Sequence, residues 1–242
     1  MKGYCFKVKK KSIINILIIL MITSLIISIS NILTYKNNIS KNKKQFEELK
    51  IKNNINFENE YIKNQHNISE LIKKYNDMIG WIYIPNTNIN YPIMNSESYL
   101  NKDFEGNKSI SGTPFIDKNS SINPRSQITI IHGHNMKDGS MFNNLIKYTN
   151  EDFFNCNKDL IFYTENSVEF YNIISANFID ITTEHNKIYS YSNINETFSK
   201  IINETSIFNK VEIDNKSNII ILSTCDNNND NKRIIIIAKK IQ

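Results

Sequence analysis

The chain has 242 residues, of which 40% are hydrophobic and 11% aromatic, enough for one domain with a substantial core. Its formal charge of +5 is unevenly distributed. The first 50 residues hold ten lysines and two glutamates, whereas the rest of the chain holds 19 basic and 22 acidic residues. Because the body of the chain is therefore slightly acidic, the composition gives little support to a nucleic-acid-binding function.

The N-terminal segment combines a basic cluster with a long uncharged run. Residues 1–12 contain five lysines, and Ile13–Leu33 contains 21 residues without a charge. As a helix this run is about 32 Å long, enough to cross a bilayer core of about 30 Å. We expect residues 1–12 to be cytoplasmic, 13–35 to span the membrane and the rest to be extracellular, because the denser lysine cluster precedes the span. A cleaved signal peptide is the alternative.

The three cysteines, Cys5, Cys156 and Cys225, do not form a disulfide framework in this prediction. Cys5 would lie on the cytoplasmic side of the span and could not pair with the other two. Exported compartments oxidise exposed thiols, so a free cysteine in an exported domain is unusual. A chemical role for one of these thiols is therefore worth considering.

Residues 36–75 and 76–242 differ in pattern. Apolar residues recur at helical spacing in 36–75, which contains neither proline nor glycine, and this predicts a helical stalk followed by N-terminal helices. A partly disordered tether is the alternative for 37–55. From residue 76 onward, short β-rich runs alternate with turn residues, and two helices are expected, one after Ser140 and one from about Asn193 to Glu204.

The number of short strands predicts the architecture of residues 76–242. Many short strands with few helices favour a mainly β, α+β domain built as a closed β-barrel with helical insertions. The expected strands are Gly80–Pro85, Ile89–Ile93, Gly112–Ile116, Gln127–His132, Leu160–Tyr163, Val168–Ile181, Asn218–Leu222 and Arg233–Ala238.

Two strand ends carry side chains suited to thiol chemistry. Cys225 follows the aliphatic strand Ile219–Leu222 and precedes a polar loop, where a catalytic thiol would be both well held and reachable. A buried core cysteine is the alternative. Arg233 opens the next aliphatic run, and a hairpin would return it beside Cys225. It is one of only two arginines, which suggests a need for a bidentate donor.

A third strand end offers a base for the thiol. The aliphatic run Ile128–Ile131 is followed by His132, Gly133 and His134, and either histidine could serve Cys225. Their spacing also raises the alternative of a zinc site, although no third ligand stands nearby in the sequence. His66 and His185 lie in polar stretches and are expected to be surface residues.

These motifs together resemble those of sortases. Leu222-Ser223-Thr224-Cys225 followed by Arg233 resembles the T-L-x-T-C…R signature of that family, and Gly133-His134-Asn135 resembles its histidine motif. Ile221 stands where the signature has Thr, and His132 where a Tyr is common. The resemblance covers roughly residues 70–240. Three stretches are similar to class B sortases in particular: Gly133–Phe142, Gly80–Pro92 and Tyr99-Leu100…Phe104…Gly106…Gly112.

The resemblance implies a sortase-like barrel and a cysteine transpeptidase without a cofactor or metal. Cys225 would attack a C-terminal sorting motif of surface proteins, His134 would act as acid and base, and Arg233 would stabilise the oxyanion. The acceptor would be a peptidoglycan amine. The same resemblance places three further residues along the substrate groove: Ser223, Thr224 and Asp226. Two alternatives remain: a hydrolytic cysteine peptidase using the same three catalytic residues, and a non-catalytic binding module in which Cys225 belongs to the core.

Overall fold

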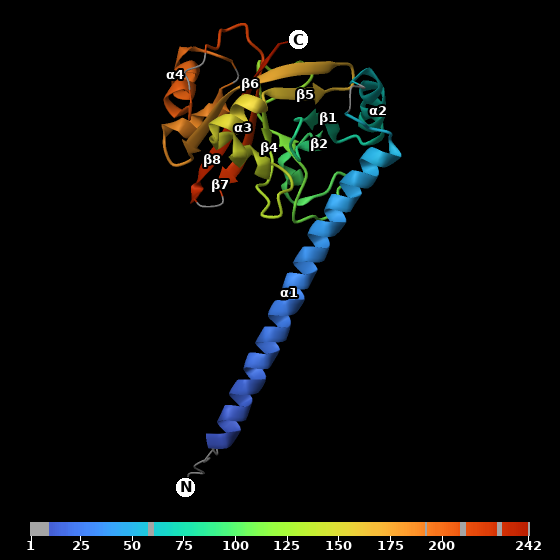
Figure 1. Cartoon of the computed structure of the whole chain (residues 1–242), viewed down its shortest axis with the longest axis vertical. Coiled ribbons are helices and arrows are strands. Elements are labelled where there is room, and N and C mark those ends of the chain that lie inside the picture. The colour runs from blue at the N-terminus through green and yellow to red at the C-terminus, as the bar shows by residue number, and fades with distance from the viewer. Residues whose placement is uncertain (1–9, 58–60, 192, 209–211, 227–228, 242) are drawn as a thin grey trace, which may run out of the picture. The chain divides into compact units, whose positions relative to one another are not determined.

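A computed structural model describes residues 10–57, 61–191, 193–208, 212–226 and 229–241 (Figure 1). Cys5 lies outside these ranges. The chain forms two compact units, residues 1–41 and 42–242. Helix α1, Lys10–Lys52, contributes to both. From Ser12 it is long and apolar enough to cross a membrane, and the large side chains of its apolar run are exposed, as expected of a membrane anchor or a signal sequence.

The second unit is built on a closed barrel of eight strands, which confirms the predicted fold. The order around the barrel is β1-β2-β3-β4-β7-β8-β6-β5. The strands are β1 (Met78–Tyr83), β2 (Asn90–Met94), β3 (Phe115–Ile116), β4 (Ile128–His132), β5 (Asp159–Tyr163), β6 (Val168–Asp180), β7 (Ile219–Asp226) and β8 (Asn229–Lys240).

The pairing of β4 with β7 brings distant parts of the sequence together. These strands run parallel, with Ile128 opposite Ile219 and His132 opposite Ser223. Their paired stretches, Ile128–Ile131 and Ile219–Leu222, are aliphatic except for Thr129, because side chains on both of their faces are buried. One face contributes Ile131, Ile220 and Leu222 to the barrel core, and the other packs against α4 and its neighbouring segments. The carboxyl ends of the two strands therefore lie side by side.

The helices lie outside the barrel strands (Figure 1). α2 (Tyr61–Lys74) contacts β1 and β6, and the short 3-10 helix η1 (Glu97–Asn101) lies beside β3. The helix expected after Ser140 is in fact two, η2 (Asn143–Thr149) and α3 (Glu151–Cys156). Asn150 separates them, because its side chain accepts a hydrogen bond from the Phe153 N–H and so starts a new helix.

The other insertion is helical as predicted, but it contains a further short helix before the expected one. It consists of η3 (Glu184–Ser190) and α4 (Glu196–Thr205). α4 begins at Glu196 rather than near Asn193, because the Asn195 side chain caps it by accepting from the Phe198 N–H. Its buried face, Phe198 and Ile202, covers the outer surface of β7 and β8.

Candidate active site

Cys225 and Arg233 lie opposite each other on neighbouring strands. β7 continues past Leu222, where the aliphatic run ends, to Asp226, and in the β7–β8 ladder Cys225 pairs with Arg233. The expected long polar loop is shorter, because β8 already begins at Asn229, which pairs with Asp226. Cys225 is exposed. Its exposure argues against a core cysteine. The pairing puts the Arg233 backbone opposite that of Cys225, and the Arg233 guanidinium donates from Nη1 to the Lys232 carbonyl over 3.0 Å.

His134 follows the end of β4 and is tied to the Cys225 strand by its neighbours. The Thr224 hydroxyl donates to the Gly133 carbonyl over 2.7 Å, and the Gly133 N–H donates to the Ser223 carbonyl over 3.1 Å. On the other side, the Asn135 amide donates to the Cys225 carbonyl over 2.8 Å. The residues on both sides of His134 are thus hydrogen-bonded to the segment that carries the thiol.

The His134 ring is half-buried and has a backbone partner. Its Nε2 lies 2.9 Å from the carbonyl oxygen of Leu100, which belongs to η1. Burial lowers the pKa of His134, because desolvation disfavours the charged ring, and the hydrogen bond to Leu100 offsets part of this effect. The neutral ring is therefore favoured over a wider pH range than in a free histidine.

His132 has a different partner. Its Nε2 lies 2.8 Å from Oδ2 of Asp117, just after β3. Burial raises the pKa of the Asp117 carboxyl, but hydrogen bonds from His132 and the Asn119 N–H outweigh it and leave the pKa below its ordinary value. Among the residues that the structure describes, no three His, Cys, Asp or Glu side chains group as metal ligands would.

Among the described residues, the other histidine and cysteine side chains lie on other elements than those that carry His134 and Cys225. His66 is exposed on α2, and the side chain of His185 lies outside the described part of the chain. Cys156, at the end of α3, is a free and exposed thiol. It belongs to a different element from Cys225 and is a natural control for it.

The three predicted groove residues have different environments. Ser223 and Thr224 are buried, and Asp226 is partly buried. The Ser223 and Tyr189 hydroxyl oxygens are 2.8 Å apart. Burial raises the pKa of Tyr189 to about 12, while its bond to Ser223 and the Arg233 charge lower it and the Cys225 charge raises it. Tyr189 is therefore joined to the Cys225 strand through Ser223.

Sequence reasoning missed three contributors to this site: Leu100, Tyr189 and Asn135. Asn135 adjoins His134 in the histidine motif, so its position could have suggested a role. Tyr189 lies in an insertion far from the other motifs, and Leu100 acts through its main chain. Tyr189 has no signal in a single sequence, and the class B-like stretch that contains Leu100 does not reveal the use of its carbonyl.

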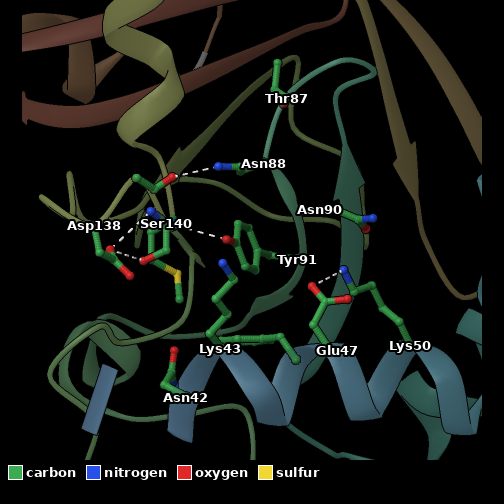
Figure 2. A pocket seen from close by; sticks show the side chains of 13 residues that line it. Asn42, Lys43, Glu47, Lys50, Thr87, Asn88, Asn90, Tyr91, Asp138 and Ser140 are labelled. Carbon is green, nitrogen blue, oxygen red and sulfur yellow. Dashed lines mark hydrogen bonds and ion pairs between the residues drawn. The ribbon is translucent and has the colours of Figure 1, made fainter. Parts of the chain in front are cut away.

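The loop after His134 borders a hollow of about 170 Å³ (Figure 2). The wall opposite the loop consists of the last turns of α1 and the β1–β2 turn. Figure 2 shows Tyr91 directed toward the loop segment that carries Asp138 and Ser140, and its hydroxyl accepts a 3.1 Å hydrogen bond from the Met141 N–H. The Asn88 amide donates to the Gly139 carbonyl over 3.1 Å. The hollow is thus bordered by the contacts that Tyr91 and Asn88 make with the loop after His134.

Comparison with known proteins identifies the family of this barrel. Residues 82–241, two thirds of the chain, match the family model described as Sortase domain. The chain belongs to the sortase family. It is 32% identical over 185 residues to Sortase B of Listeria monocytogenes and 30% identical over 183 residues to Sortase B of Staphylococcus aureus. Each alignment covers 72% of this sortase and 74% of the relative.

Solved sortase B structures share the fold. A Staphylococcus aureus sortase B–substrate complex superposes with a TM-score of 0.71 at 24% identity, over 84% of this sortase and 97% of that chain. A sortase B complexed with Gly3 gives 0.68 at 25% identity, over 86% and 98%. The resemblance to class B is thereby confirmed. This sortase is a cysteine transpeptidase of the sortase B family, whose members anchor surface proteins.

Proposed function

We propose that Cys225 is the nucleophile of this transpeptidase, His134 its acid and base, and Arg233 its oxyanion-stabilising group. The observation that carries this proposal is the pairing of Cys225 with Arg233 across β7 and β8. This pair lies at the barrel end where β4 leads into His134, which its two neighbours tie to the Cys225 strand. The fold thus brings Cys225 and Arg233 to the barrel end from which the His134 loop starts, which supports their proposed roles.

In the first step, the Cys225 sulfur attacks the carbonyl carbon of a threonine in a C-terminal sorting motif. The S–C bond forms, the C–N bond of the peptide breaks, and His134 gives a proton to the leaving amine. Arg233 receives the oxyanion that develops on the carbonyl oxygen. Its planar fork can address that oxygen with two N–H groups, whereas a lysine offers a single compact ammonium.

In the second step, a peptidoglycan amine attacks the thioacyl carbon. His134 takes a proton from the incoming nitrogen, the new amide bond forms, and Cys225 leaves as the thiolate. The same ring gives a proton in one step and takes it back in the next. Burial moves the His134 pKa downward from its ordinary value, which favours the neutral ring that the second step needs.

Three residues lie near the thiol on the same strand, β7. We assign Ser223, Thr224 and Asp226 to the wall of the substrate groove, with no covalent role. Thr224 would act mainly by holding the Gly133 carbonyl and thus the histidine loop, since its hydroxyl is used in that bond. Ser223 would act through Tyr189, its partner at 2.8 Å.

The partners and location follow from the family and from α1. Solved sortase B relatives include one described as a substrate complex and one complexed with Gly3, which supports a peptide donor and an amine acceptor for this chain. We propose surface proteins with a C-terminal sorting motif as donors and a peptidoglycan cross-bridge or precursor amine as acceptor. The apolar run of α1 would hold the enzyme as a single-pass protein of the cell membrane, with the barrel extracellular.

Intact-protein mass measurement tests this assignment. Incubation with candidate sorting peptides should add the acyl fragment to the wild-type enzyme and to Cys156→Ala, which removes the other exposed thiol. Cys225→Ala should gain no mass. Addition of a glycine-based amine should then release a ligated peptide, whereas release of only the free acid would indicate a hydrolase. An adduct on Cys156 alone would contradict the proposal.

A further inference from the structure

The hydrogen bond between His134 and Leu100 determines which ring nitrogen carries a proton. The Leu100 carbonyl oxygen lies 2.9 Å from Nε2 and can only accept. Nε2 must therefore carry the hydrogen. In the neutral ring the other nitrogen, Nδ1, is left with its lone pair, and protonation of the ring adds the second proton there.

The Leu100 carbonyl is held by the segment around Thr113. The Thr113 N–H donates to the Tyr99 carbonyl over 2.9 Å, and the Thr113 hydroxyl donates to the Lys102 carbonyl over 3.0 Å. These two bonds flank Leu100 on both sides. The Tyr99 hydroxyl adds a third anchor by donating to Asp77 over 2.7 Å. The backbone that presents the carbonyl to His134 is therefore fastened at several points.

Gly112 makes this arrangement sterically possible. Its φ is +60°, and a Cβ at this position would lie 2.2 Å from the Leu100 oxygen and 2.9 Å from the Tyr99 oxygen. Cβ atoms do not approach carbonyl oxygens that closely, so any other residue at 112 would displace the Leu100 peptide group. A side chain at 112 would thus collide with the oxygen atom that accepts from His134, and glycine leaves that space free.

We propose that the Leu100 carbonyl, for which the absence of a side chain at Gly112 leaves room, is the positioning group that holds His134 as the Nε2–H tautomer, so that Nδ1 exchanges the proton with the substrate amines. This inference rests on the proposed catalytic role of His134. Leu100 and Gly112 act through the histidine ring and are positioning residues. They take the place that a carboxylate occupies in a Ser–His–Asp triad.

A carbonyl differs from a carboxylate in a way that suits an amine-exchange reaction. It orients the ring by a hydrogen bond without adding a full negative charge, and so it stabilises the imidazolium less. In the first step the Nδ1 proton passes to the leaving nitrogen, and in the second step the incoming nitrogen returns one to Nδ1. The Nε2–H stays on the Leu100 oxygen throughout, so the ring keeps one orientation for both steps.

Nitrogen NMR of the wild-type enzyme tests the tautomer directly, without reference to activity. With ¹⁵N-labelled histidine, and His134→Gln to assign its signals among the four histidines, the neutral ring should show a protonated Nε2 and an unprotonated Nδ1. A protonated Nδ1, or equal populations of the two tautomers, would overturn the proposal.

Two glycine variants then test the link to catalysis. Gly106 also has a positive φ, +88°, and lies in the same stretch, but among the described residues no heavy atom lies within 4 Å of its virtual Cβ. Gly106→Ala therefore imposes similar backbone strain without touching Leu100. Gly112→Ala should lower kcat on the order of 100-fold, as expected for a misplaced catalytic group, with KM for the sorting peptide little changed. Gly106→Ala should keep wild-type kcat.

The outcomes separate the two levels of the proposal. A folded Gly112→Ala with wild-type kcat and an unchanged tautomer would overturn the positioning role. If Gly112→Ala does not fold, the tautomer measured by NMR in the wild-type enzyme decides whether the proposal holds. Full activity of His134→Ala would instead refute the proposed role of the histidine, whichever nitrogen of its ring is protonated.

Discussion

At the residue scale, Arg233 is proposed to act through the shape of its guanidinium group as well as its charge. Arg233→Lys keeps the charge but loses the planar fork, so transpeptidation should fall on the order of 10²–10³-fold, the usual loss for one oxyanion donor. Alkylation of Cys225 by a small reagent should persist, because that reaction builds no oxyanion. The melting temperature should be little changed, since Arg233 is only half-buried at the edge of the sheet.

The other arginine is a control for this experiment. Arg125 lies before β4, at the opposite end of the barrel, where it pairs with Glu169 at 2.9 Å and donates to the Tyr171 hydroxyl over 2.7 Å. Arg125→Lys should lower the free energy of unfolding by about 1.5–3 kcal/mol, the value of a hydrogen bond to a charged group, and leave kcat near wild type. Near-normal transpeptidation by Arg233→Lys would reduce Arg233 to a general electrostatic partner of the thiolate.

The two histidines near the site should respond differently to substitution. His134→Ala should abolish transpeptidation, whereas His132→Tyr should retain much of it, because His132 is bonded to Asp117. Initial rates with a sorting peptide and an amine acceptor provide the measurement. Equal loss from both changes would point back to a paired metal site, and metal analysis of the purified protein would then decide.

At the scale of elements, the loop after β4 depends on β2. The Phe142 N–H donates to the His134 carbonyl over 2.9 Å, so the loop between them is closed on itself, and Tyr91 holds its far side through the Met141 N–H. Tyr91→Phe removes that acceptor and leaves a buried N–H unpaired, which should cost about 1–3 kcal/mol of unfolding free energy. Because the loop carries the histidine, kcat should fall severalfold as well.

Tyr148→Phe is the matched control for Tyr91→Phe. Tyr148 is fully buried in the barrel core, and its hydroxyl donates to the Asn157 carbonyl over 2.8 Å, away from the histidine loop. It should lose a comparable amount of stability in chemical denaturation with no change in kcat. A parallel loss of kcat in both variants would show that the Tyr91 effect is one of general stability.

The strands were largely predictable, and their ends were not. Aliphatic runs such as Ile128–Ile131 and Ile234–Ile237 indicate buried strands because both of their faces must be covered. The extension of β7 through Ser223–Asp226 escaped prediction, since these polar residues become strand only through pairing with β8 and, at Ser223, with β4. Local preference was overridden there by tertiary pairing.

The placement of the candidate site could be predicted where side chains are proposed to carry the chemistry. Cys225, His134 and Arg233 stand at the ends of aliphatic runs, and hairpin geometry alone suggested that Cys225 and Arg233 meet. The Leu100 carbonyl could not be predicted, because every residue has one and only the fold selects which is used. Tyr189 reaches the site through an insertion whose docking a single sequence does not specify.

At the scale of the whole molecule, topology is the open prediction. Five lysines before Ile13–Leu33 favour a retained span with the N-terminus inside. Protease added to intact cells should remove the barrel and leave a small membrane-bound fragment, detectable with a tag at the N-terminus. Full protection of the barrel would reverse the orientation, and a soluble product lacking the N-terminal segment would mean that the run is a cleaved signal.

The strand order of the barrel also sets when the enzyme can become active. β7 lies between β4 and β8, and the hydrogen bond from Thr224 to Gly133 spans 91 residues of sequence. During biosynthesis, the histidine loop and the Leu100 carbonyl emerge long before the thiol and the arginine, which enter together on the last two strands. Such distant pairings form late in folding. A nascent chain therefore lacks the assembled candidate site, and insertion of the C-terminal hairpin would bring the proposed nucleophile and the arginine into place in a single event.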